Sequence, residues 1–171
     1  GSTARAYAQA AFAHFGADIV TVNGYLGEDS IAPFIADPEK GVFLLCKTSN
    51  PSAVDLQDQA LRSGDAVYEH IASLAERWNT QDNVGLVVGA TYPETLTTIR
   101  SEHPDLWMLT PGIGAQGADT TSAIQAGIRE DGMGMLVPIS RGISTADSPA
   151  KAAQHYRDEI NAARSTPRTS K

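Results

Sequence analysis

Short apolar runs alternate with longer amphipathic segments along most of the chain. The apolar runs, each about the length of a strand, cover residues 17–22, 41–46, 84–88, 106–109 and 133–139. The middle three lack the polar alternation of a one-sided sheet, so we expect both of their faces to be buried. This alternation predicts repeated βα units on a parallel sheet, and therefore an α/β fold.

Segments with helical spacing of apolar residues separate these runs. They cover residues 3–15, 30–36, 65–78, 93–101, 120–127 and 149–163. Ser148 before Pro149 is typical of an N-cap followed by a first-turn proline, Thr91 and Glu94 have the spacing of a capping box, and Gly127 suits a helix end. The order is one helix followed by five strand–helix units. A closed (β/α)₈ barrel needs eight units, typically ~250 residues.

Two architectures fit such a pattern: an open doubly wound sheet, or part of a larger barrel. Five parallel strands left open would expose hydrogen-bonding groups at the sheet edges. The polar segment 165–171 is expected to be a disordered tail or a linker.

Composition and charge limit the classes of partner that the chain can bind. A formal charge of -7 and no visible basic cluster argue against nucleic acid, so an anionic ligand would need a local positive pocket. No apolar run approaches the ~18 residues of a membrane span, and the first residues lack a signal-peptide profile, so we expect no membrane partner and a cytoplasmic location. The single cysteine, Cys46, lies in an apolar run and is expected to be an inert core residue.

The loops after the strands carry the candidate chemistry, because ligands bind at the carboxyl ends of parallel strands. Residues 110–119 contain three glycines and a proline, and Gln116 there can donate and accept hydrogen bonds to a phosphate or a pyrimidine edge. Tight turns that require positive φ values would explain the same glycines.

The loop after the last strand contains Ser140, Arg141 and Gly142. An arginine at a strand end, close to a helix start, is expected to hold a phosphate through its guanidinium and nearby backbone donors. The alternative is a surface arginine paired with Asp147. Barrel phosphate sites lie after strands seven and eight, and the placement of these two loops favours the phosphate interpretation.

A third loop, residues 48–64, is long and follows the second strand. Ser49 in this loop either hydrogen-bonds a heterocycle or stabilises a turn before Asn50. Asn23 and Thr91 resemble turn or capping residues.

Metal and general acid or base groups are not evident at the strand ends. The four histidines fall in or at the ends of expected helices, so a histidine-rich metal site is not predicted. Glu28 and Asp29 are expected in the first turn of a helix.

Four strings in this order and spacing carry a resemblance to a known family: GSTA (1–4), CKTSNPSA (46–53), TPGIGAQG (110–117) and PISRG (138–142). Together they resemble orotidine 5'-phosphate decarboxylase, especially its bacterial-type branch, over nearly the whole chain. The resemblance implies a TIM (β/α)₈ barrel, of which residues 1–164 supply about strands 4–8. It implies decarboxylation of orotidine 5'-phosphate to UMP, in de novo pyrimidine biosynthesis, without metal or cofactor.

The resemblance also assigns roles to individual residues. Ser49 contacts the pyrimidine, Pro111 lies against the base, and Gln116 reaches the phosphate as its loop closes over the ligand. Arg141 and the backbone near Ser140 hold the phosphate. Thr3 matches a family threonine that reaches the ribose region of the neighbouring subunit's site, which implies a homodimer with shared active sites.

The family's catalytic lysines and aspartates belong to a motif of the type Asp-x-Lys-x-x-Asp-Ile, expected directly before Gly1, so no catalytic residue is assigned in this chain. We expect the chain alone to be inactive and to require the missing N-terminal barrel segment as a partner. Two other hypotheses remain: a non-catalytic phosphate- or nucleotide-binding module, and a related metal-dependent sugar-phosphate lyase or synthase.

Overall fold

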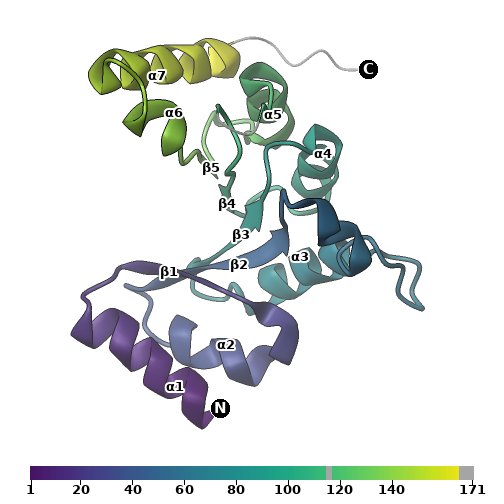
Figure 1. Ribbon diagram of the computed structural model, residues 1–171. Coiled ribbons are helices and arrows are strands. Elements are labelled where there is room, and N and C mark those ends of the chain that lie inside the picture. Colours follow the sequence, from purple (N-terminus) through teal and green to yellow (C-terminus); the bar gives the residue numbers. More distant parts are fainter. Residues whose placement is uncertain (115–116, 166–171) are drawn as a thin grey trace. The chain divides into compact units, whose positions relative to one another are not determined.

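Five strands, β1 to β5, form a sheet in which the strand order is the sequence order (Figure 1). The pairs β1–β2 and β4–β5 are parallel, as the βα pattern predicts. The computed structural model describes residues 1–114 and 117–165 and divides into two units, Gly1–Val87 and Val88–Lys171, here called unit 1 and unit 2. Each unit is described by itself.

Unit 1 contains the first strands and the helices beside them. Its elements are α1 (Ser2–Gln9), the π-helix η1 (Ala10–His14), β1 (Ile19–Val22), the 3₁₀-helix η2 (Gly24–Leu26), α2 (Glu28–Ile35), β2 (Gly41–Lys47), the 3₁₀-helix η3 (Pro51–Asp55), α3 (Val67–Trp78) and all but the last residue of β3 (Val84–Val88). Helices α1 and α2 lie side by side (Figure 1). The register of the first pair runs from Ile19 opposite Gly41 to Val22 opposite Leu44.

The core of unit 1 is centred on β2 and β3. Every residue of β3 is buried, and β2 is buried at five of its seven positions, which confirms that both faces of these strands are covered. Cys46 is 2% exposed, and its Sγ donates a hydrogen bond to the Tyr68 carbonyl at 3.2 Å. Burial raises the pKa of the Cys46 thiol well above its usual range, so the expectation of an inert core cysteine is confirmed.

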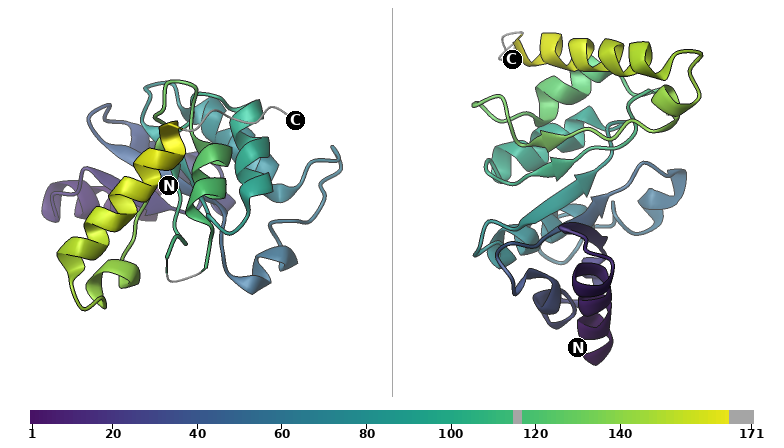
Figure 2. Two further views of the ribbon diagram at one scale, coloured as in Figure 1. Left: turned by 90° about the horizontal axis from the view of Figure 1, so that it is seen from above. Right: turned by 90° about the vertical axis from the view of Figure 1, so that its left-hand side faces the viewer.

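The described residues of unit 2 form the last strands and four helices. Its elements are α4 (Pro93–Glu102), β4 (Met108–Leu109), α5 (Thr120–Gly127), β5 (Met135–Leu136), α6 (Arg141–Ser144) and α7 (Pro149–Ser165). The long helix α7 packs against α5 and α6 (Figure 2). Leu96, Ile99, Met108 and Ile124 are fully buried at the centre of this unit.

The structure differs from the sequence-based expectations at several points. The helix expected over residues 3–15 is α-helical only to Gln9 and then becomes a π-helix, in which Phe15 N–H donates to Ala10 O at 2.9 Å. The prediction of a capping box at Thr91 and Glu94 is wrong, because Tyr92 is the N-cap of α4. The Thr91 hydroxyl has no hydrogen-bond partner within the described part of the chain. Glu28 and Asp29 lie in the first turn of α2, as expected.

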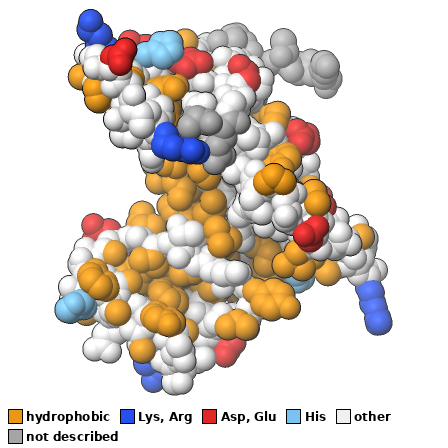
Figure 3. Space-filling model, viewed as in Figure 1, with side chains coloured by type: hydrophobic (Ala, Val, Ile, Leu, Met, Phe, Trp, Pro, Cys, Tyr) orange, Lys and Arg blue, Asp and Glu red, His pale blue; other side chains and the backbone are white. Residues whose placement is uncertain are grey.

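Apolar side chains also gather on the surface of unit 1 (Figure 3). The most exposed are Tyr7 (67%), Phe15 (78%), Tyr25 (75%) and Leu26 (77%). Among the helices of the described residues, none has the length and apolar content to cross a bilayer.

Candidate functional site

Backbone hydrogen bonds fix the first two residues of the loop after β4, Thr110 and Pro111. Thr110 N–H donates to Leu136 O at 2.8 Å, and Pro111 O accepts from Ala90 N–H at 2.8 Å. Pro111, which the family resemblance would place against the base, is therefore held at the end of β4. Gln116, expected to reach a phosphate, lies outside the described residues.

The glycines of this loop have the backbone that tight turns require. Gly112, Gly114 and Gly117 have φ values of 119°, 84° and 76°, a region that side-chain-bearing residues rarely adopt. Asp119 ends the loop as N-cap of α5, where its Oδ1 accepts from Ser122 N–H at 2.8 Å. These hydrogen bonds lower the pKa of the Asp119 carboxyl. The positive φ values confirm that these glycines form tight turns. Ligand binding by the same loop stays a prediction.

The loop after β5 presents Arg141 to solvent. Ser140 precedes α6, and its carbonyl accepts from Ile143 and Ser144 N–H at 3.1 and 2.8 Å. The Arg141 side chain is exposed and makes no hydrogen bond or ion pair with any described residue, so the alternative pairing with Asp147 is not formed. A cation in this loop that has no partner among the described residues is available to an anionic ligand.

Tyr156 of α7 brings these two loops together, and sequence reasoning missed it. A Cβ atom added to Gly114 or to Gly142 would lie 2.7 Å from the Tyr156 hydroxyl oxygen in each case. The glycine loop after β4 and the arginine loop after β5 therefore meet at one side chain. The signal available in the sequence was only a tyrosine on the apolar side of an expected helix.

In unit 1, hydrogen bonds order the start of the loop after β2. Thr48 N–H donates to Gln57 Oε1 at 2.9 Å, and Gln57 Nε2 donates to Thr48 Oγ1 at 2.8 Å. Thr48 Oγ1 donates to Asn50 Oδ1 at 2.6 Å. Ser49 lies half-buried between these residues, and its hydroxyl makes no hydrogen bond to any described residue. The turn-stabilising role therefore belongs to Thr48, which leaves the Ser49 hydroxyl available.

A partly buried ion pair holds the far part of the same loop. Lys47, the last residue of β2, pairs with Asp58, and their side chains are 3% and 39% exposed. The Lys47 ammonium also lies 5.9 Å from the centre of the Tyr68 ring. Burial, together with the hydrogen bond from the Tyr68 hydroxyl to Glu69, raises the pKa of Tyr68 to about 12. The loop is thus anchored to β2 and α3, and it contains η3, so it has structure of its own.

Thr3, expected to serve a neighbouring subunit's site, is exposed on α1. It makes no hydrogen bond with Ser49, the other site residue expected in unit 1. No group of three or more histidine, cysteine or carboxylate side chains within residues 1–114 and 117–165 is placed to hold a metal ion. His14, His70, His103 and His155 all lie in helices or at a helix end, as expected.

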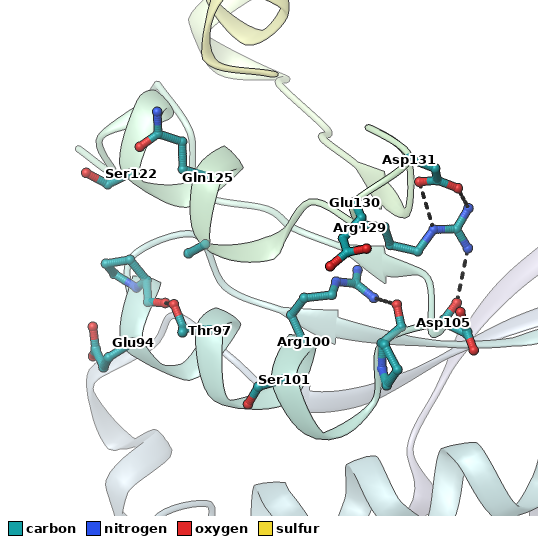
Figure 4. A pocket seen from close by; sticks show the side chains of 13 residues that line it. Glu94, Thr97, Arg100, Ser101, Asp105, Ser122, Gln125, Arg129, Glu130 and Asp131 are labelled. Carbon is teal, nitrogen blue, oxygen red and sulfur yellow. Dashed lines mark hydrogen bonds and ion pairs between the residues drawn. The ribbon is translucent and has the colours of Figure 1, made fainter. Parts of the chain in front are cut away.

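A separate pocket of about 1080 Å³ lies beside α4 and α5 (Figure 4). None of Pro111, Ser140 and Arg141 lines it. Its two arginines are already engaged: Arg100 donates to backbone carbonyls, and Arg129 pairs with Asp131 and donates to Asp105 O. Since four carboxylates, Glu94, Asp105, Glu130 and Asp131, also line it, this pocket does not suit a phosphate.

Comparison with known proteins decides the family. The model of the orotidine 5'-phosphate decarboxylase / HUMPS family matches residues 1–156. The chain belongs to this family. The resemblance found in the four sequence strings is therefore confirmed.

Relatives within the orotidine 5'-phosphate decarboxylase / HUMPS family match almost the whole chain. The orotidine 5'-phosphate decarboxylase of Roseiflexus sp. (strain RS-1) is 46% identical over 171 residues, which cover 95% of this chain and 63% of the relative. That of Paracidovorax citrulli is 47% identical over 175 residues, covering 96% and 64%. The chain therefore spans less than two thirds of these relatives.

A solved structure within the family establishes the fold. The Leishmania donovani OMP decarboxylase is 46% identical, with a TM-score of 0.91 over 97% of this chain and 65% of that chain. Such structures are TIM barrels, so the five parallel strands are part of a (β/α)₈ barrel. Of the two architectures that the sequence left open, the partial barrel is confirmed.

Proposed function

We propose that this chain acts in the decarboxylation of orotidine 5'-phosphate to UMP, a step of de novo pyrimidine biosynthesis, as part of a carboxy-lyase. The observation that carries the proposal is the identity of 46–47%, over 95–96% of the chain, with proteins named orotidine 5'-phosphate decarboxylase. The chain contributes the phosphate- and pyrimidine-binding part of the active site.

The phosphate end of this site is in unit 2. Arg141 has an exposed guanidinium without a described protein partner, which supports its role as the phosphate cation. Ser140 precedes it, and the first N–H groups of a helix have no acceptor within the helix and can donate to the same anion. Gln116 adds an amide to this end.

Ser49 and Pro111 serve the pyrimidine in this proposal. The Ser49 hydroxyl, freed from turn stabilisation by the Thr48 network, hydrogen-bonds the base. Pro111 packs against the base from a backbone fixed by Ala90. Thr3 serves the ribose region of a neighbouring subunit, in a cytoplasmic homodimer with shared active sites.

This division of labour fits the chemistry of decarboxylation. A carbanion intermediate is stabilised by charges fixed in a water-excluded pocket, and the lysine and aspartate side chains that supply those charges come from outside residues 1–171. Binding of the remote phosphate supplies free energy that assembles the pocket around the reacting carbon. Arg141 therefore contributes to the rate without touching the reacting atoms.

Complementation tests the proposal. The chain is mixed with the segment of the Roseiflexus relative that precedes the matched region, and UMP formation from orotidine 5'-phosphate is measured by chromatography. We expect neither polypeptide to be active alone and the mixture to form UMP, and a mixture carrying Arg141→Ala to lose most of this activity.

Three outcomes would contradict the proposal. A folded complex that binds UMP without turnover identifies a nucleotide-binding module. Turnover of a sugar phosphate that depends on magnesium identifies the lyase or synthase alternative. A folded complex that binds neither a nucleotide nor phosphate, and that turns over no sugar phosphate, excludes all three hypotheses.

A further inference from the structure

Tyr156 occupies a position that neither the family match nor the sequence motifs explain. It is half-buried on the 17-residue helix α7, and it faces two loops that the proposed function assigns to one ligand. We propose that Tyr156 is a positioning residue that sets the distance between the glycine loop after β4 and the arginine loop after β5. This inference rests on the proposed function, because its consequence is phosphate binding.

The geometry shows a single oxygen held between two backbones. A Cβ on Gly142 would lie 2.7 Å from the hydroxyl oxygen and 3.1 Å from the ring carbon Cζ, and a Cβ on Gly114 would lie at 2.7 and 3.2 Å. Real Cβ atoms essentially never approach a heavy atom closer than 3.0 Å. Both loops therefore lie closer to the hydroxyl than a residue with a side chain would allow.

The backbone of Gly142 does not itself require glycine. It lies in α6, outside the positive φ region, where alanine is the better helix former. Gly114, by contrast, has a φ of 84° that already favours glycine. The Tyr156 side chain therefore accounts for the missing side chain at Gly142.

Contact with Gly142 affects the ligand because Arg141 is the preceding residue. A displacement of the Gly142 backbone moves the guanidinium, and a misplacement of 1 Å at a binding group can cost about 100-fold in rate. Tyr156 stands on a 17-residue helix, and groups held by a helix are positioned more precisely than groups held by a loop.

The test uses the complemented protein and compares two ligands, UMP and uridine, which differ by the phosphate. Gly142→Ala should weaken UMP binding about 10-fold and leave uridine binding unchanged, because only the phosphate loop is displaced. Tyr156→Phe removes the oxygen and should restore most of the affinity when combined with Gly142→Ala, since the remaining contact of 3.1 Å needs a shift of only a few tenths of an ångström.

The matched control is Ser144→Ala, an alanine substitution in the same short helix at an exposed position, which should leave both affinities unchanged. Equal losses for UMP and uridine in Gly142→Ala, or no recovery in the double variant, would overturn the positioning role. If the unsubstituted protein binds UMP no better than uridine, the proposed function fails first, and the role of Tyr156 fails with it.

Discussion

At the residue scale, the Arg141 side chain pairs with no described residue, a property that it shares with Arg5, Arg62 and Arg77. What distinguishes Arg141 is its place in the loop after β5, which meets the glycine loop at Tyr156. Arg157 and Arg129, by contrast, pair with Asp158 at 2.7 Å and with Asp131 at 2.9 Å. Exposed pairs of this kind contribute little to stability. An arginine that is left unpaired beside a converging pair of loops is better explained by a ligand than by folding.

Replacing Arg141 by alanine should weaken UMP binding at least about 10-fold, because a hydrogen bond to a charged group contributes ~1.5 kcal/mol or more. Isothermal titration of the complemented protein measures the change. Arg141→Lys should recover part of the affinity, since lysine keeps the charge and loses the planar fork.

Arg157→Ala is the matched control, because it removes an exposed arginine that already has a carboxylate partner. It should bind UMP as the unsubstituted protein does. Unchanged UMP affinity in Arg141→Ala would contradict the assignment of the phosphate cation.

At the scale of elements, Arg100 connects segments of unit 2 that are far apart in sequence. The residue is 6% exposed, and its guanidinium donates to the carbonyl oxygens of five residues: Gly127 at 2.7 Å, His103 at 3.4 Å, Pro104 at 2.8 Å, Leu106 at 2.7 Å and Gly134 at 3.0 Å. The end of α4, the end of α5 and the residues before β4 and β5 thus share one side chain. This arginine stabilises the very short strands that backbone pairing alone holds weakly.

Arg100→Lys should lower the free energy of unfolding by about 2–4 kcal/mol, because an ammonium has three donors where the guanidinium has five, and the carbonyls left over are buried. Urea unfolding followed by circular dichroism measures the loss. Arg129→Lys, at a more exposed arginine, should change stability by less than about 1 kcal/mol. Equal effects of the two substitutions would show that the buried carbonyls do not depend on Arg100.

The strands that could be predicted from sequence are those buried on both faces. Strand β3 matches its apolar run at both ends, and β2 extends its run by one residue, Lys47, whose charge is neutralised by Asp58. Strands β4 and β5 have two residues each, much shorter than their apolar runs, because few residues of those runs pair. Helix α6, with four residues, is too short to show a helical period.

The loops of the candidate site could be predicted from the sequence, whereas the side chain that joins them could not. Loop composition indicated Arg141 and the glycine loop, because strand ends are where ligands bind. Tyr156 was not predictable, since its role depends on a contact with two distant glycines and not on a local pattern. Thr91 was misassigned because its spacing to Glu94 suits a cap, whereas the helix begins one residue later, at Pro93.

At the scale of the whole molecule, the chain exposes large apolar side chains and spans only part of the length of its relatives, and we interpret the two observations together. Phe15, Tyr25 and Leu26 are each at least 75% exposed, while the chain spans 63% of the Roseiflexus relative. Large exposed apolar side chains mark surfaces that another polypeptide covers.

The isolated chain should therefore bind the dye ANS strongly, and its fluorescence should fall when the complementing segment is added. Titration with the segment, followed by fluorescence, measures this, and an unrelated protein of similar size serves as control. UMP formation should recover at the same molar ratio of segment to chain at which the fluorescence stops falling. If activity returns with no fall in dye binding, the covered surface lies elsewhere.

The π-helix η1 has a consequence for the direction in which Thr3 points. Five residues, Ala10–His14, close a wider turn than an α-helix, which amounts to one residue inserted into the helical repeat. Each residue of an α-helix advances about 100° around its axis. Deleting Ala11 would return the segment to a continuous α-helix and rotate Thr3 by about 100° relative to β1, so an alanine remote from Thr3 selects the face on which that threonine is presented.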